Sequence, residues 1–254
     1  MTRAIVLAGS PNNGRLKDCS SAPNEALIKI GNKFMVEYVV EALLVSQKIE
    51  KIIVVGPKLS LERIFQKKIK DLKIVESGET IIQSLLNAMD FIGNDLNSRV
   101  LVVTSDIPLI TGQIIDNFIE ECINEEADII YPIVSKSVNQ AKFPGVKRTY
   151  VRLKEGVFTG GNIFLIKPSI IKPCAYYAEE LVQLRKSPLK LLKYIGFEYF
   201  LKYLFRNLSI KDAELRISQL FNIKGKAISV SHSEIGVDVD KPSDLELVER
   251  VLGK

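Results

Sequence analysis

Short apolar runs alternate along the first half of the chain with segments in which apolar residues recur every three or four positions. The strand-like runs and the helix-like segments follow one another in the order 4–7, 35–45, 51–55, 61–70, 73–75, 80–91 and 100–104. In the segment 35–45, Val36, Val39, Val40 and Leu43 form one apolar helix face, which is expected to cover a sheet. Strand and helix in alternation predict an α/β fold with three α/β/α layers around a mostly parallel sheet.

The second half of the chain first continues this alternation and then departs from it. Residues 114–122 and 128–132 extend the pattern, and the β-rich residues 146–158 around a Glu155-Gly156 turn predict a hairpin beside the sheet. Residues 173–222 keep helical spacing and predict an inserted helical subdomain with a basic face and aromatic neighbours. A strand at 227–230 and a helix at 243–251, begun by Pro242, close a single domain that spans 1–254.

Composition narrows the class of protein. With 254 residues, 46% of them hydrophobic, the chain is long enough to bury a substantial core. No apolar run approaches the ~20 residues that span a bilayer, and no cleavage-site pattern follows the N-terminus, so we expect a cytoplasmic protein without a transmembrane segment. Cys19, Cys122 and Cys174 stand singly, which supports neither a disulfide framework nor a zinc site.

Charge and histidine content argue against a nucleic-acid-binding protein and against histidine-based catalysis. The net charge of +5 comes from residues spread along the chain, without the basic tail typical of nucleic-acid binders. A modest positive charge suits small anionic substrates instead. The single histidine, His232, lies between two serines in what we interpret as a surface loop, so catalysis built on histidine is not expected.

A glycine-punctuated loop follows the first strand directly. It runs from Leu7, Ala8 and Gly9 to Gly14, Arg15 and Leu16. Glycines in such a loop let backbone N–H groups approach phosphate oxygens. The spacing of the two glycines matches a P-loop, but Arg15-Leu16 stands where that motif needs Lys and a Ser or Thr. Taken alone, the loop is equally compatible with a plain turn.

Carboxylates follow two other strand-like segments. The strand 100–104 runs into Asp106, at the edge of an open α/β sheet where ligands bind. Near the C-terminus, alternation in an extended segment sends Asp238 and Asp240 to the same side, while Asp244 is expected in the first turn of the last helix. A solvated loop is the alternative interpretation of this second group.

These segments together resemble the MobA-like nucleotidyltransferases, a family with a glycosyltransferase-A-like fold. The resemblance rests on Leu7-Ala8-Gly9, on Arg15-Leu16, on residues 24–38 and on the closing Asp-x-Asp-x-Pro-x-Asp-Leu motif. It implies transfer of a nucleoside monophosphate from an NTP to a phosphorylated sugar or alcohol, with release of pyrophosphate. It also implies that Asp106 and Asp238 hold Mg²⁺, a cation that suits two oxygen ligands plus phosphate oxygens.

The resemblance assigns further residues to the nucleotide and to the acceptor. It implies nucleotide contacts from Leu7, Ala8, Gly9, Gly14, Gly78 and Ser84, and acceptor contacts from Gly161 and Asn162. Glu25 stands where the family has a lysine that grips the NTP phosphates, so that charge must be missing or come from Arg15, Lys17 or Lys29, of which Arg15 is preferred because it falls on a matching position. Ile81 replaces the arginine of related cytidylyltransferases, so the resemblance suggests CTP without requiring it, and CTP or GTP is the expected donor. Alternatively, 76–84 is only a helix start capped by Ser77, and 158–164 only a β-turn.

Three other functions remain open at this point. A glycosyltransferase of the same fold would release a nucleoside diphosphate, and a molybdenum-cofactor guanylyl- or cytidylyltransferase would use a pterin phosphate acceptor. A nucleotide-binding regulatory module without turnover is the third, motivated by Glu25. The sequence fixes neither the acceptor nor the oligomeric state, and it leaves a homodimer open.

Overall fold

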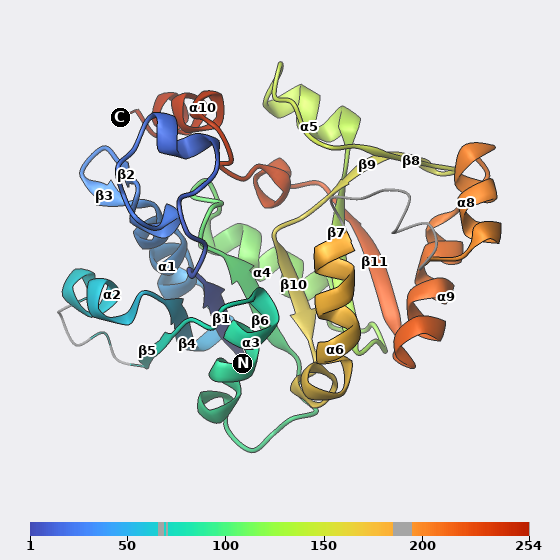
Figure 1. Cartoon of the computed structure of the whole chain (residues 1–254), viewed down its shortest axis with the longest axis horizontal. Coiled ribbons are helices and arrows are strands. Elements are labelled where there is room, and N and C mark those ends of the chain that lie inside the picture. The colour runs from blue at the N-terminus through green and yellow to red at the C-terminus, as the bar shows by residue number, and fades with distance from the viewer. Residues whose placement is uncertain (66–68, 70, 185–194, 254) are drawn as a thin grey trace.

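The protein is built around one large sheet (Figure 1). The computed structural model describes residues 1–254 except 66–68, 70, 185–194 and 254. Across the described residues the sheet has nine strands, in the order β5-β4-β1-β6-β10-β7-β9-β8, with β11 paired to β7. All pairs among β5, β4, β1 and β6 are parallel, as is β7 with β11, whereas β10 runs antiparallel to both β6 and β7. The α/β fold with a mostly parallel sheet is therefore confirmed.

The strands of this sheet are short and mostly apolar. Their bounds are β1 Thr2–Leu7, β4 Ile49–Gly56, β5 Leu72–Glu76, β6 Val100–Thr104, β7 Ile129–Ser135, β8 Val151–Leu153, β9 Gly156–Gly160, β10 Ile163–Ile166 and β11 Gly225–Val230. A separate hairpin joins β2 Lys29–Ile30 to β3 Lys33–Phe34. The expected hairpin around Glu155-Gly156 is confirmed as β8 and β9.

Helices cover both faces of the sheet, and α1, α3, α4 and α6 contribute buried apolar residues to the cores on these faces. The helices are α1 Met35–Val45, α2 Lys58–Ile64, α3 Ile81–Ile92, α4 Gly112–Glu121, α5 Lys136–Lys142, α6 Pro168–Leu184, α8 Phe197–Leu204, α9 Ile210–Phe221 and α10 Pro242–Leu252. One face packs Ala4 and Val6 against α1 and α4. The opposite face packs Ile5 and Val102 against α3 and α6. This is the three-layer arrangement expected from the sequence.

The described parts of the segment between β10 and β11 are mainly helical, as the periodicity predicts, but the first helix begins earlier. Helix α6 starts at Pro168 and contains Pro173, the residue at which the prediction placed its start. Part of the predicted helical segment 173–222, namely residues 185–194, lies outside the described residues. None of the helices in the described part of the chain is long and apolar enough to cross a membrane.

A third apolar cluster holds the loops that surround the carboxyl ends of the strands. Leu16 and Ile28 pack with Val237, Val239 and α10. The loop after β1, the segment before β2 and the C-terminal acidic segment are therefore joined through one small core.

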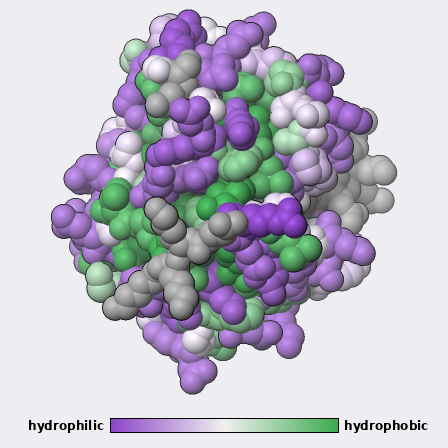
Figure 2. Space-filling model, turned by 90° about the vertical axis from the view of Figure 1, so that its left-hand side faces the viewer, coloured by the Kyte–Doolittle hydropathy of each residue, from purple (hydrophilic) through white to green (hydrophobic). Residues whose placement is uncertain are grey.

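On the side of the molecule that carries α2, Figure 2 shows apolar patches scattered among polar residues.

We expect the contact of α4 with the sheet to be a main source of stability. The ring of Phe118 is fully buried in the larger core cluster, so Phe118→Ala should lower the free energy of unfolding by ~3–5 kcal/mol. Ile123→Ala, at a side chain that is 66% exposed, should change it by less than ~0.5 kcal/mol. Urea denaturation measures both, and equal losses would show that α4 does not anchor this core.

Candidate active-site cleft

A cleft of about 510 Å³ opens at the carboxyl ends of β1 and β6. Three loops supply most of its wall: the loop after β1, the turn that leads into α3, and the turn after β6. Residues from the start of β10 and from the segment before α10 complete it. The lining residues are Leu7, Gly9, Ser10, Pro11, Asn13, Glu25, Gly78, Glu79, Thr80, Ile81, Ser84, Thr104, Ser105, Asp106, Asn162, Asp238 and Asp240. Ligands bind at this edge in open α/β sheets.

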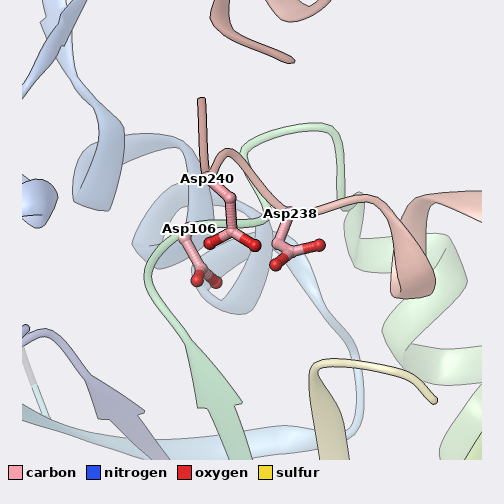
Figure 3. A group of neighbouring side chains, drawn as sticks. All are labelled: Asp106, Asp238 and Asp240. Carbon is pink, nitrogen blue, oxygen red and sulfur yellow. The ribbon is translucent and has the colours of Figure 1, made fainter. Parts of the chain in front are cut away.

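Three aspartates point toward one another in this cleft (Figure 3). One carboxylate oxygen from each of Asp106, Asp238 and Asp240 lies within 4.8 Å of the other two. Hard oxygen donors at this spacing suit Mg²⁺, which is usually held by a few carboxylates together with water and substrate phosphate. The donor set therefore fits the predicted cation and adds Asp240 to the two ligands expected from the sequence.

Backbone geometry explains how residues so far apart in sequence meet. Val237 and Val239 are fully buried, and in an extended segment their neighbours Asp238 and Asp240 must then face outward into the cleft. The N–H of Val239 donates to the carbonyl of Asp106 over 2.9 Å, which fixes this segment against the turn after β6. The Asp106 carboxylate also accepts a hydrogen bond from the hydroxyl of Thr104.

The aspartates perturb one another electrostatically. Burial raises the pKa of Asp106 to about 6, and the nearby Asp240 adds to this effect. Burial raises the pKa of Asp238 to about 7, and Asp106 adds to it, whereas Arg148 acts in the opposite direction. The raised pKa values show that the negative charges of these carboxylates are poorly stabilised, and a divalent cation bound between them would reduce their repulsion.

Arg148 is the principal counterion of the cluster. Its side chain is only 6% exposed and pairs with the carboxylate and the backbone carbonyl of Asp238. It also lies 3.9 Å from the carboxylate of Asp244, which Lys241 approaches from the other side at 3.5 Å. The guanidinium is thus held behind the cleft, where it fixes the orientation of Asp238 without lining the cavity.

The cleft itself is strongly acidic. Five lining residues are acidic, namely Glu25, Glu79, Asp106, Asp238 and Asp240, and none of the described lining residues is Lys, Arg or His. Burial raises the pKa of Glu25, a hydrogen bond with Ser10 lowers it, and Asp240 raises it further. Like charges so arranged repel a polyphosphate unless cations intervene.

The structure brings together most of the residues expected at the site. Leu7, Gly9, Gly78, Ser84, Asp106, Asn162 and Asp238 all line the cleft. The remaining predicted residues do not line it. Arg15 and Lys29 are exposed elsewhere, and the ammonium of Lys29 lies over the ring of Phe34 at 5.4 Å. Gly14 is exposed outside the lining, and Ala8 is buried beneath it.

Gly9 and Gly161 are required for close packing around the cleft. A side chain at Gly9 would lie 2.6 Å from Cβ of Ser77, so the loop after β1 can sit against the turn before α3 only without one. Gly161 has a packing role: its side-chain position is taken by Ile235, 2.5 Å away, and its N–H donates to the carbonyl of Pro132. Of the two residues expected at the acceptor, only Asn162 faces the cleft.

The structure corrects the expected N-cap of α3. Thr80, not Ser77, caps α3, because its hydroxyl accepts from the N–H of Gln83. The hydroxyl of Ser84, in the first turn of α3, accepts a hydrogen bond from the N–H of Gly78 and so stabilises the turn that lines the cleft.

Asp244 lies in the first turn of α10 as expected. The three cysteines are free.

Comparisons with known proteins agree with this architecture. The family profile of the MobA-like NTP transferase domain matches residues 4–187. A hypothetical transferase from Thermus thermophilus is 32% identical, with a TM-score of 0.82 over 96% of this chain and 99% of its own. No curated protein sequence matches significantly.

Two more distant structures share the fold. One is CMP:2-keto-3-deoxy-manno-octonic acid synthetase complexed with CTP, at 17% identity and a TM-score of 0.61. The other is 4-diphosphocytidyl-2C-methyl-D-erythritol synthase from Anaerococcus prevotii, at 12% identity and 0.59. Each alignment covers 100% of this chain and 99% of the other.

Without metal, we expect Asp106→Asn to stabilise the protein at high pH. The raised pKa of Asp106, about 6 against 3.8 in an ordinary setting, means that the folded state binds the extra proton between these values. The free energy of unfolding of the variant relative to wild type should therefore rise as pH increases from about 4 to about 7. Urea denaturation in EDTA measures it, with Asp90→Asn, at an exposed residue of α3, as the control. A constant difference would contradict the burial of this charge.

The opposite pH dependence is expected for Arg148→Met. Removing the guanidinium leaves the Asp238 carboxylate without its counterion, which should cost ~3–5 kcal/mol at pH 8. At pH 5, below the raised pKa of about 7, Asp238 is protonated and the loss should be smaller. Arg148→Lys should recover part of the stability at pH 8. An equal loss at both pH values would assign Arg148 to packing alone.

Proposed function

Since the chain belongs to the MobA-like NTP transferase domain family, we propose that it transfers a nucleoside monophosphate from an NTP to a phosphorylated small molecule and releases pyrophosphate. The observation that carries the proposal is the meeting of Asp106, Asp238 and Asp240 at the carboxyl end of β6, beside the loop after β1. The acceptor is a sugar phosphate or an alcohol phosphate, and the donor is CTP or GTP.

The reaction is an in-line displacement at the α-phosphorus. An oxygen of the acceptor phosphate forms a bond to the α-phosphorus, the bond to the α,β-bridging oxygen breaks, and pyrophosphate leaves with that electron pair. A phosphate monoester has a second pKa near ~6, so it is already ionised at neutral pH and needs no general base. His232 contacts Asn117 over 3.2 Å and does not line the cleft, which agrees with a reaction that needs no histidine.

Asp106, Asp238 and Asp240 are the residues that would hold Mg²⁺. When bound there, the cation neutralises charge on the triphosphate and on the transition state. Thr104, in the wall of the cleft, orients the carboxylate of Asp106, and Arg148, outside the lining, orients that of Asp238. Catalysis then depends on positioning and electrostatics, since the described lining of the cleft contains neither a cysteine nor a histidine.

The nucleotide fits between the loop after β1 and the turn before α3. Gly9 and Gly78 expose backbone there, which lets phosphate or base approach closely. Glu25 occupies the place of the expected lysine and lines the same wall. We therefore infer that the NTP binds as its metal complex, and that this dependence on cation is stronger than in a site containing a lysine.

A regulatory module that binds nucleotide without turnover is the second candidate. The acidic lining and Glu25 favour it, because the described cleft contributes no cation of its own to the transition state. The two candidates differ in one measurable product. Only the transferase releases pyrophosphate when an acceptor phosphate is added to the NTP.

We expect one of CTP and GTP to bind with Mg²⁺ and to bind at least ~tenfold more weakly in EDTA. Isothermal titration measures the affinity, and a coupled assay measures pyrophosphate release with sugar-phosphate and alcohol-phosphate acceptors. Asp106→Asn should reduce both binding in Mg²⁺ and release, whereas Asp90→Asn should change neither. Binding that is equally tight in EDTA would refute the metal requirement, and binding without release across the acceptors would favour the regulatory module.

Glu25→Lys isolates the contribution of the acidic wall. Replacing a negative by a positive charge beside the triphosphate should raise nucleotide affinity in EDTA by ~tenfold or more, and by less in Mg²⁺. Glu25→Gln should lie between the variant and wild type. If Glu25→Lys leaves the affinity in EDTA unchanged, the triphosphate does not lie beside this residue.

A further inference from the structure

A second hollow lies on the sheet beyond the cleft. This groove, of about 320 Å³, runs between α9 and the strands β7 and β11. Its lining residues are Ile129, Tyr131, Ile133, Leu153, Ile210, Ala213, Glu214, Ile217, Gly225, Lys226 and Ala227. Alternate residues of β7 face it, so it is a part of the sheet face that the described residues leave incompletely covered. An apolar concavity of this kind is a common form of small-molecule site.

The two charged residues in the wall already have partners. The carboxylate of Glu214 accepts a hydrogen bond from the N–H of Ala227 over 2.8 Å and lies 3.7 Å from the ammonium of Lys226. The remaining described wall is aliphatic or aromatic apart from backbone. The groove therefore favours a hydrocarbon group. A charged group bound there would lose its hydration without gaining a new charged partner from the described wall.

Tyr131 connects the groove with the cleft. Its ring faces the groove, and its hydroxyl lies 2.3 Å from the position that a side chain on Gly160 would take. Gly160 thus makes room for this tyrosine. The chain then passes through Gly161, bonded to the carbonyl of Pro132, directly into Asn162 in the wall of the cleft. Tyr131 is 41% exposed overall, but the surroundings of its hydroxyl are desolvated, which raises its pKa, and the charge of Asp238 raises that pKa further.

We propose that the groove holds the hydrocarbon chain of the acceptor, a phosphorylated alcohol whose phosphate lies in the cleft near Asn162. The role given to that phosphate rests on the proposed function. Tyr131 of the groove wall lies against Gly160, two positions before Asn162 of the cleft wall, and this arrangement fits a molecule with one ionic end and one apolar end. A second copy of the chain is a less suitable occupant, because Tyr131 links this concavity to the cleft and not to an open flat surface.

The test compares two alkyl phosphates that differ only in chain length. Isothermal titration of octyl phosphate and propyl phosphate measures binding without any turnover, so its result is independent of nucleotidyl transfer. Ala213→Phe, which places a ring in the groove, is compared with Ala141→Phe at an exposed position of α5. Nucleotide titration of each variant reports whether the cleft is intact, and sedimentation reports the oligomeric state.

We expect octyl phosphate to bind at least ~tenfold more tightly than propyl phosphate, because burial of each added methylene is favourable. Ala213→Phe should abolish this difference while nucleotide binding persists, and Ala141→Phe should preserve it. Equal affinity of the two alkyl phosphates, or a chain-length preference that survives Ala213→Phe, overturns the inference. A change of oligomeric state in Ala213→Phe alone would also overturn it and would assign the groove to a subunit contact.

Pyrophosphate release separates this inference from the proposed function. Release with sugar phosphates but no preference for octyl phosphate means that the transferase proposal stands and the groove proposal fails. Preferential binding of octyl phosphate without release from any acceptor means that the groove binds the chain and the transferase proposal fails.

Discussion

Mutual repulsion of three carboxylates is the constraint on which the functional end of this protein depends. Asp106, Asp238 and Asp240 lie within 4.8 Å of one another, and left alone they would separate or take up protons. The fold opposes separation with buried valines beside two of them, with a backbone hydrogen bond between the two segments, and with the buried guanidinium of Arg148. What remains is a preorganised concentration of negative charge, which is the physical requirement for capturing a divalent cation together with an anionic substrate.

The same repulsion between negative charges extends to the rest of the cleft, whose described charged lining residues are all acidic. In a site lined by lysine or arginine, protein and metal share the neutralisation of a triphosphate. Here Glu25 adds negative charge, and Arg15 and Lys29 lie outside the lining. Under the proposed function, bound cations instead of side chains would neutralise the triphosphate, and substrate binding would depend on cation concentration.

The sequence predicted the parts of the site that depend on local pattern. Asp106 follows a buried strand, and alternation placed Asp238 and Asp240 on one side, so their convergence was foreseeable. Arg148 was not, because it belongs to an irregular segment and only the tertiary fold brings it to a carboxylate 90 positions away. Gly161 was expected at the acceptor, yet its missing side chain accommodates Ile235. A glycine in a sequence does not reveal whether a ligand or a neighbouring side chain needs the space.

The reversed direction of β10 has a consequence for how this protein tolerates change. Because β10 begins at the cleft and ends at Ile166 on the opposite edge, the helices that follow leave the sheet on that opposite edge. The chain also re-enters there, at Gly225, since β11 is parallel to β7. Both attachment points of this long segment are thus remote from the three aspartates. Insertions, deletions or exchange of this segment can therefore alter the surface beyond the cleft without moving the parts of the chain that carry the three aspartates, which makes the segment the natural place for redesign to begin.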